Sequence, residues 1–251
     1  MTYCVAIALN AGLVFAADSR TNAGVDQVQT HSKMFTFGIA GERQFVILSS
    51  GNLATTQSVI AELRHHIESN SQTNLLNVGR MQDAADYVGG MVRDETARHA
   101  AAVSAAGFNA ETTLLFGGQI AGRDQRLFLI YPQGNHIACS EETPYMQIGE
   151  TKYGKPILDR VVTADTSIEE ASLCAMVSLD STMRSNASVG PPVELLTYVN
   201  NSFVIDRYLR LEGDDPQLLG IRQGWNEQIN RAFHALPALQ WDAQMQKTPS
   251  I

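Results

Sequence analysis

The stretch "MTYCVAIALNAGLVFAADSR" (residues 1–20) holds two apolar runs separated by the turn residues of "NAG". It has two interpretations, a secretory signal peptide or a β-hairpin. A signal peptide carries a basic residue ahead of its apolar run, but here the first basic residue, Arg20, follows that run. Turn residues between two short apolar runs are typical of a hairpin. The stretch therefore predicts antiparallel strands at residues 2–9 and 13–18.

The rest of the sequence alternates groups of strands with pairs of helices. Period-two apolar patterns predict strands at residues 33–39, 44–50, 112–120, 126–132, 136–140 and 202–211. Helical periodicity predicts helices at residues 53–70, 81–104, 152–163, 167–184 and 215–236. This order favours an α+β fold with two packed sheets and helices outside them. We expect one domain over residues 1–236 and a surface tail over residues 237–251.

Composition narrows the classes of function. The 251 residues carry a net charge of -8 and no basic stretch, which argues against binding to nucleic acid or to an anionic membrane. Three scattered cysteines form no CxxC pair, so we expect a reducing, cytoplasmic location. No apolar run reaches the roughly 18 residues that span a bilayer. The histidines show no metal-ligand spacing, and we expect neither a metal nor a cofactor.

Two charged residues near the amino terminus are candidates for chemistry. Asp18 ends the second predicted strand, where a turn aspartate is also common. Lys33 is the only lysine in the first 151 residues and shares a predicted strand face with apolar side chains. A lysine there is costly to bury unless an acid pairs with it. The alternative, which spacing alone favours, is an inward stem whose ammonium group reaches solvent.

Thr2 adds a nucleophile to these two residues. Methionine aminopeptidase generally removes Met1 when the next residue is small, so we expect Thr2 to carry a free α-amino group. The pKa of such an amine is about 7.7–8.0, and it can accept the proton of the threonine hydroxyl. A nearby ammonium group would lower the pKa of the amine and stabilise developing negative charge, and a carboxylate would orient that ammonium.

The order of Met-Thr, "ADSRTN" (residues 17–22), Lys33 and "SSGN" (residues 49–52) resembles the β-subunits of proteasomes. Those proteins are N-terminal-nucleophile hydrolases, and the opening segment is most similar to their bacterial branch, Anbu (ancestral β-subunit). Weaker likeness continues through "IGETKYGKPILDR" to "SLDSTM" and covers about residues 1–210. The resemblance implies a four-layer αββα sandwich in a bacterial, cytoplasmic protein.

The resemblance also implies a role for individual residues. Thr2 matches the nucleophile, Lys33 the active-site lysine, and Asp18 the acid that pairs with this lysine. The other matches are Arg20, which supports the acid, Gly51, whose N–H helps to bind the oxyanion, Asn22, whose main chain pairs with substrate, and Asp180, the distal aspartate near the threonine amine.

Departures from the family pattern affect the predicted proton relay. Glu150 stands where a serine handles the amine proton, and a carboxylate there either does similar work or changes the pH dependence. Met183 stands where a serine follows the distal aspartate, although other serines are near. The segment "MRSNASVGPP" (residues 183–192) has the character of an inserted or rebuilt loop.

These residues favour a threonine peptidase that cleaves peptide or unfolded protein within a homo-oligomer. The resemblance implies a double-layered ring or helical assembly, with subunit contacts from the segment beyond residue 210. The alternative is a non-catalytic scaffold, because proteasome assemblies also contain inactive subunits. A retained Met1 would favour the scaffold, since it blocks the amine. The sequence identifies no ATPase partner.

Overall fold

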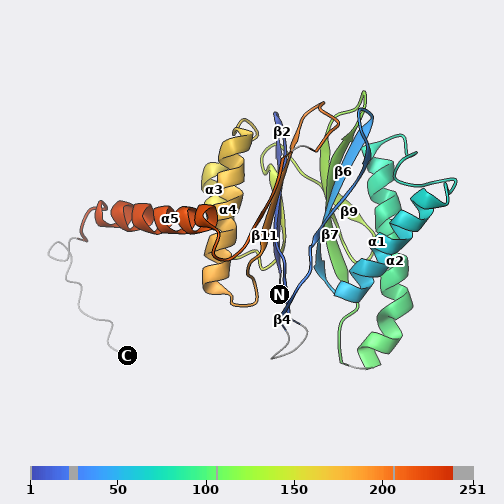
Figure 1. The fold of residues 1–251 in the computed structure, drawn as a ribbon, viewed down its shortest axis with the longest axis horizontal. Helices are drawn as coiled ribbons and strands as arrows, with labels where there is room; N and C mark the ends of the chain where they lie inside the picture. Colours follow the sequence, from blue (N-terminus) through green and yellow to red (C-terminus); the bar gives the residue numbers. More distant parts are fainter. Residues whose placement is uncertain (1, 23–27, 106, 206, 240–251) are drawn as a thin grey trace, which may run out of the picture.

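Two five-stranded antiparallel sheets form the centre of the molecule (Figure 1). The computed structural model describes residues 2–22, 28–105, 107–205 and 207–239. Met1 and residues 240–251 of the predicted tail lie outside the described residues. The first sheet has the order β10-β1-β2-β11-β12. Its strands are β1 (Tyr3–Leu9), β2 (Gly12–Asp18), β10 (Tyr145–Gly149), β11 (Val193–Val199) and β12 (Arg207–Leu211).

The second sheet has the order β5-β6-β7-β8-β9. Its strands are β5 (Met34–Ile39), β6 (Arg43–Gly51), β7 (Thr112–Ile120), β8 (Arg126–Ile130) and β9 (His136–Ala138). A separate two-stranded ribbon pairs β3 (Arg20–Asn22) with β4 (Val28–Thr30). The predicted opening hairpin is confirmed as β1 and β2, and they belong to the first sheet.

Helices cover the outer face of each sheet (Figure 1). The second sheet is covered by α1 (Leu53–Glu68) and α2 (Met81–Ala105). The first is covered by α3 (Lys155–Val161) and α4 (Ile168–Ser185). A capping box between Ser167 and Glu170 begins α4. The last helix, α5 (Pro216–His234), begins with Asp215 as its cap and points away from the body.

Side chains of β1 show how the layers are built. Tyr3, Val5 and Ile7 pack against the helices of the first sheet, whereas Cys4 and Ala6 lie in the core between the two sheets. The small residues on the second face let the sheets approach each other. A third core joins the second sheet to α1 and α2. The predicted α+β fold, a four-layer αββα sandwich, is therefore confirmed.

The predicted closing strand at residues 202–211 is wrong in its first half. Among the described residues of that segment only 207–211 form a strand, and residues 193–199, which were not predicted as a strand, form β11 between β2 and β12. Asn201 and Phe203 have positive φ values of 64° and 52°, which interrupt an extended chain. The Phe203 carbonyl instead accepts a hydrogen bond of 3.1 Å from Gly41 N–H, at the turn between β5 and β6.

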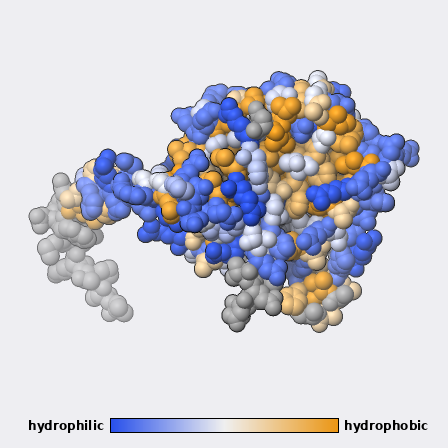
Figure 2. Space-filling view, in the orientation of Figure 1, coloured by the Kyte–Doolittle hydropathy of each residue, from blue (hydrophilic) through white to orange (hydrophobic). Residues whose placement is uncertain are grey.

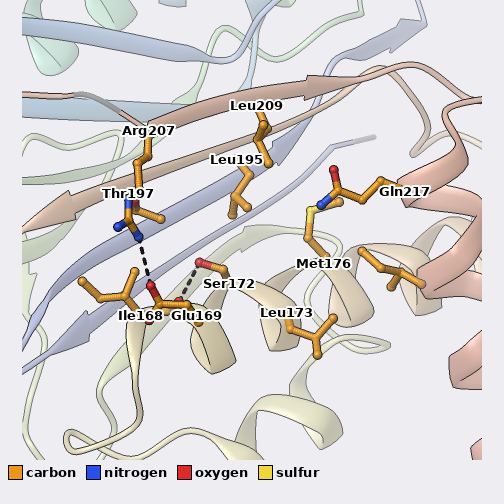
Figure 3. Close-up of a pocket in the computed structure, with 11 residues that line it drawn as sticks. Ile168, Glu169, Ser172, Leu173, Met176, Leu195, Thr197, Arg207, Leu209 and Gln217 are labelled. Carbon is orange, nitrogen blue, oxygen red and sulfur yellow. Dashed lines mark hydrogen bonds and ion pairs between the residues drawn. The ribbon is translucent and has the colours of Figure 1, made fainter.

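Exposed apolar side chains are concentrated on and beside α5. Ile229, Phe233 and Leu236 follow one another at helical spacing and are 48%, 68% and 65% exposed. Figure 2 shows hydrophobic surface where α5 leaves the body. A cavity of about 290 Å³ lies there, between α4, the β11–β12 pair and the start of α5, and an ion pair of 2.9 Å joins Arg207 to Glu169 at its side (Figure 3). We call this cavity the α5 groove; its apolar lining comes from Ile168, Leu173, Met176, Leu195, Leu209 and Ile221.

Within the described ranges, no helix is both long enough and apolar enough to cross a membrane.

Candidate active site

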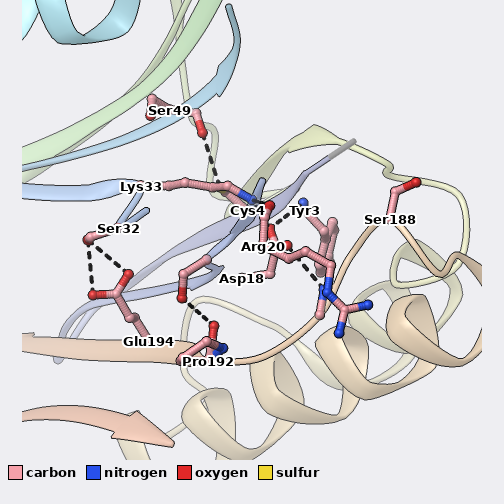
Figure 4. A network of polar contacts seen from close by, with 12 residues as sticks. Tyr3, Cys4, Asp18, Arg20, Ser32, Lys33, Ser49, Ser188, Pro192 and Glu194 are labelled. Atoms are coloured by element: carbon pink, nitrogen blue, oxygen red, sulfur yellow. Dashed lines mark hydrogen bonds and ion pairs between the residues drawn. The ribbon is translucent and has the colours of Figure 1, made fainter. Parts of the chain in front are cut away.

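Asp18 is the centre of a buried polar cluster at one end of the two sheets (Figure 4). Its Oδ1 accepts hydrogen bonds from Lys33 Nζ at 2.6 Å and from Tyr3 N–H at 3.0 Å. Its Oδ2 accepts a third from Gly190 N–H at 3.2 Å. Burial raises the pKa of the Asp18 carboxyl above its usual value, and the Lys33 ammonium and the two backbone N–H groups offset part of this rise. These three donors favour the ionised form against the cost of burial.

Lys33 reaches this carboxylate from the other sheet. It lies one residue before β5, its side chain is 7% exposed, and its Nζ also donates to the Arg20 carbonyl at 2.8 Å. The ammonium group is therefore buried and paired, and the alternative of a solvent-exposed head does not hold. The pair connects the end of β2 in the first sheet to the start of β5 in the second.

Thr2 lies next to the pair, because the N–H of the following residue, Tyr3, binds Asp18. The Thr2 carbonyl accepts a hydrogen bond of 2.7 Å from Glu150 N–H. Gly149 has a φ of +85°, and a Cβ at that position would lie 2.0 Å from the Thr2 carbonyl oxygen. Only glycine fits there. The main chain of Thr2 is thus fixed on its carboxyl side.

Gly51 ends β6 close to the same point. A Cβ built on Gly149 would lie 3.2 Å from Ser50 Oγ, so the end of β6 and the Thr2 main chain both approach Gly149. Gly51 itself has a φ of +114°, and a Cβ there would meet the Glu111 carbonyl oxygen at 2.4 Å. The backbone conformation that the candidate oxyanion donor requires is therefore available to glycine alone.

The loop over residues 186–190 closes the cluster from a third side. Arg20 Nη1 donates to the Ala187 carbonyl at 2.7 Å, and Gly190 N–H binds Asp18. A Cβ at Gly190 would lie 2.3 Å from Arg20 Cζ, so the guanidinium group packs directly on this glycine. Sequence reasoning found Arg20 but treated the loop only as rebuilt. The signal available was Gly190 next to two prolines, which indicates a constrained loop.

Glu150 is 8% exposed and lies between Thr2 and this loop. Its N–H binds the Thr2 carbonyl, and its Oε2 accepts a hydrogen bond of 3.1 Å from Asn186 Nδ2. Lys152 Nζ lies 3.8 Å from Glu150 Oε1. Asn186 is a second residue of the site that sequence reasoning missed.

Asp180 is buried on α4, and its Oδ1 accepts a hydrogen bond of 2.7 Å from Arg222 Nε of α5. This contact joins two helices and was not predicted from the sequence. The placement of Asp180 near the threonine amine, which the resemblance implies, stays a prediction.

The side chain of Asn22 is outside the described residues, although its main chain belongs to β3. In the described part of the chain, no three His, Cys, Asp or Glu side chains converge in a way that could hold a metal ion.

Comparisons with known proteins agree with this geometry. The family model described as proteasome subunit matches residues 2–197. Anbu (ancestral beta-subunit) from Yersinia bercovieri superposes with a TM-score of 0.90 at 47% identity, over 95% of this chain and 99% of that chain. The structure described as the helical assembly of the Anbu complex from Pseudomonas aeruginosa gives 0.91 at 45% identity, over 96% of this chain and 100% of that one.

A Gly-1 mutant of Anbu from Hyphomicrobium sp. strain MC1 gives a TM-score of 0.88 at 43% identity, over 96% of this chain and 100% of that chain. A search among curated proteins found no match. The likeness to Anbu thus extends over nearly the whole of both chains, and the family match includes every residue of the buried cluster. The chain therefore belongs to the proteasome subunit family and is similar in sequence and fold to Anbu, the ancestral β-subunit.

Proposed function

We propose that this chain is an N-terminal threonine hydrolase that cleaves peptide bonds after Met1 has been removed. The observation that carries the proposal is the buried Lys33–Asp18 pair, whose carboxylate also binds the N–H next to Thr2. A lysine and an aspartate buried together at the start of the chain place a fixed positive charge where a threonine nucleophile requires one.

In the proposed reaction, the Thr2 hydroxyl oxygen attacks the substrate carbonyl carbon while the Thr2 amine accepts the hydroxyl proton. The tetrahedral oxyanion is stabilised by the N–H of Gly51. The protonated amine then gives its proton to the leaving nitrogen, and the C–N bond breaks to leave an ester on Thr2. Water hydrolyses this ester and restores the hydroxyl.

Other residues of the cluster orient these groups. Asp18 keeps Lys33 charged and in place, and Arg20 holds the loop whose Gly190 N–H completes the shell around Asp18. Glu150, whose N–H binds the Thr2 carbonyl and whose carboxylate accepts a hydrogen bond from Asn186, is the acid that we propose for a proton relay. We assign no proton-transfer step to Asp180, because it pairs with Arg222.

The proposed substrate is a peptide or an unfolded protein segment in extended conformation. The main chain of β3, which includes Asn22, pairs with β4 on one side. A substrate strand that pairs with the main chain of Asn22 would be bound through its own backbone, as in strand addition, so little side-chain selectivity is needed.

The proposed function is tested by intact-mass spectrometry before and after incubation with a peptide epoxyketone. This reagent forms a ring with both the amine and the hydroxyl of an N-terminal threonine. We expect a chain without Met1 that gains one inhibitor mass, and no gain in a Thr2→Ala variant. A chain that keeps Met1 and does not react would overturn the proposal and favour a non-catalytic scaffold.

We also propose that α5 makes contacts with a second copy of this chain. Its exposed stripe of Ile229, Phe233 and Leu236 is too apolar to be left in water without cost, and the apolar α5 groove lies at its base. A related protein is described as a helical assembly of the Anbu complex. The stripe of one subunit would pack beside the groove of another, as a helix packs in a groove.

Sedimentation velocity tests this contact. We expect the wild-type chain to sediment as an oligomer and Phe233→Ser to shift the distribution toward smaller species. Phe108→Ser is the matched control, because Phe108 is 72% exposed and lies outside α5. An equal shift in both variants, or a monomeric wild type, would contradict the proposed interface.

A further inference from the structure

Glu194 is a second buried carboxylate close to the candidate site, and the proposed mechanism does not use it. It lies on β11, is 2% exposed, and stands opposite Ala17, the residue before Asp18, on the neighbouring strand β2. Throughout the described ranges, no ion pair within 4.0 Å involves Glu194. An ionised carboxylate buried among neutral groups is costly unless its hydrogen bonds are satisfied, so its partners are informative.

Two hydroxyl groups bind this carboxylate. Ser32 Oγ lies 2.9 Å from Oε2 and 3.0 Å from Oε1, and Tyr208 Oη donates to Oε1 at 2.5 Å (Figure 4 shows the contact with Ser32). Ser32 comes from the segment just before β5, and Tyr208 from the edge strand β12. The Glu194 carboxylate thus connects β12, an edge strand of the first sheet, to the segment that leads into β5 of the second sheet.

The Ser32 contact fixes the residue that follows it, Lys33. Ser32 Oγ accepts a hydrogen bond of 3.2 Å from Met34 N–H, which encloses Lys33 in a short turn. The Lys33 carbonyl accepts another of 3.0 Å from Ser49 N–H. From this turn the Lys33 side chain extends to Asp18 Oδ1 at 2.6 Å. A change in the position of Ser32 would therefore move the base of the lysine.

The charges of these groups act on one another across the core between the sheets. Burial raises the pKa of the Cys4 thiol, the Lys33 ammonium lowers it, and the carboxylates of Asp18 and Glu194 raise it. One thiol thus experiences all three charges. The charge of Glu194 therefore acts on the same thiol as the charges of Asp18 and Lys33, in addition to the contact that Glu194 makes through Ser32.

We propose that Glu194 is a positioning residue for Lys33, acting through Ser32. Its carboxylate holds the Ser32 hydroxyl, and Ser32 fixes the turn from which Lys33 reaches Asp18. The expected effect on reaction rate rests on the proposed threonine hydrolase function, whereas the expected effect on geometry does not.

The kinetic test uses the full processed chain and measures epoxyketone labelling over a range of inhibitor concentrations. We expect Ser32→Ala and Glu194→Ala to lower the maximal labelling rate by about tenfold, because each loses a hydrogen bond to a charged group, and to change the half-saturating concentration by less than about twofold. Glu194→Gln keeps one acceptor oxygen and should have a smaller effect. The double variant should be no slower than the slower single variant, because both changes break one contact.

Glu95→Gln is the matched control. Glu95 is 5% exposed but lies on α2 and pairs with Arg98, so the same chemical change should leave labelling unaffected. If Glu194→Ala does not fold, Ser32→Ala carries the same test with the loss of a single hydroxyl. Wild-type maximal rates in both Ser32→Ala and Glu194→Gln would overturn the proposal.

Crystal structures of the wild type and of Ser32→Ala provide a readout that does not depend on activity. We expect the distance between Lys33 Nζ and Asp18 Oδ1 to increase beyond the wild-type value in the variant. If the wild type does not react with the epoxyketone, the proposed function fails and this distance alone decides the role of Glu194. An unchanged distance would overturn the positioning role.

Discussion

Asp18 and Asp180 are both buried, and each accepts a hydrogen bond from a basic side chain, but the surroundings of the two pairs differ. Lys33 is 7% exposed and Asp18 also receives two backbone N–H groups, whereas Arg222 is 38% exposed. The first pair joins two sheets beside Thr2, and the second joins α4 to the projecting α5. A buried acid–base pair is therefore no sign of chemistry by itself; what distinguishes the first pair is its position next to Thr2, the proposed nucleophile.

The largest expected difference between the two pairs is in reactivity. If the proposed function holds, Lys33→Ala should slow epoxyketone labelling on the order of 10²–10³-fold, because the fixed charge beside the proposed nucleophile is lost. Arg222→Gln should leave labelling within about twofold, since Arg222 lies on α5 and binds Asp180, to which the proposed mechanism assigns no step. Intact-mass spectrometry over time measures both rates. Equal slowing in the two variants would remove the functional distinction between the pairs.

A second difference is expected in stability. Asp18→Asn should lower the free energy of unfolding by about 3–5 kcal/mol, because it leaves the Lys33 charge buried without its partner. Asp180→Asn should cost about 1–2 kcal/mol, since the guanidinium group of Arg222 is partly solvated. Urea unfolding at one fixed protein concentration compares the variants. The reverse order of losses would show that the helix pair, and not the sheet pair, stabilises the fold.

The smallest effects concern glycines next to each pair. Gly190→Ala should cost about 1–3 kcal/mol and displace Arg20, because the new methyl group meets the guanidinium. Gly220→Ala on α5 has open space and should instead raise stability by about 0.5–1 kcal/mol, as alanine favours a helix interior. Thermal unfolding monitored by circular dichroism measures both. A stabilised Gly190→Ala variant would contradict the tight packing of Arg20 on the loop.

The parts of the fold that were predicted are those with strong local signals. The opening hairpin has turn residues between two apolar runs, and β7 carries the apolar run of residues 114–116 at its centre. β11 was missed because it follows a loop with two prolines and carries Glu194 within its apolar run. Its strand character depends on pairing with β2 and β12, which local pattern does not reveal.

The residues of the candidate site also fall into two groups, those that were predicted and those that were missed. Asp18 and Lys33 are 15 residues apart, and the resemblance to a known family placed them together. Asn186 and Gly190 were missed because their contacts with Glu150 and Asp18 depend on the return of a distant loop. The contact of Asp180 with Arg222 was not predicted because it depends on how α5 packs against α4. Contacts across such separations follow from the complete topology and not from spacing.

The hydrogen bond from Gly190 N–H to Asp18 has a consequence for the timing of synthesis. The two residues are separated by 172 positions, so the nascent chain makes Thr2, Asp18 and Lys33 long before it makes the group that completes the shell around Asp18. Chains fold progressively as they leave the ribosome. The site is therefore complete only after most of the subunit has been translated. Any hydrolytic activity would begin at that stage, when little of the same chain is still unfolded and open to cleavage.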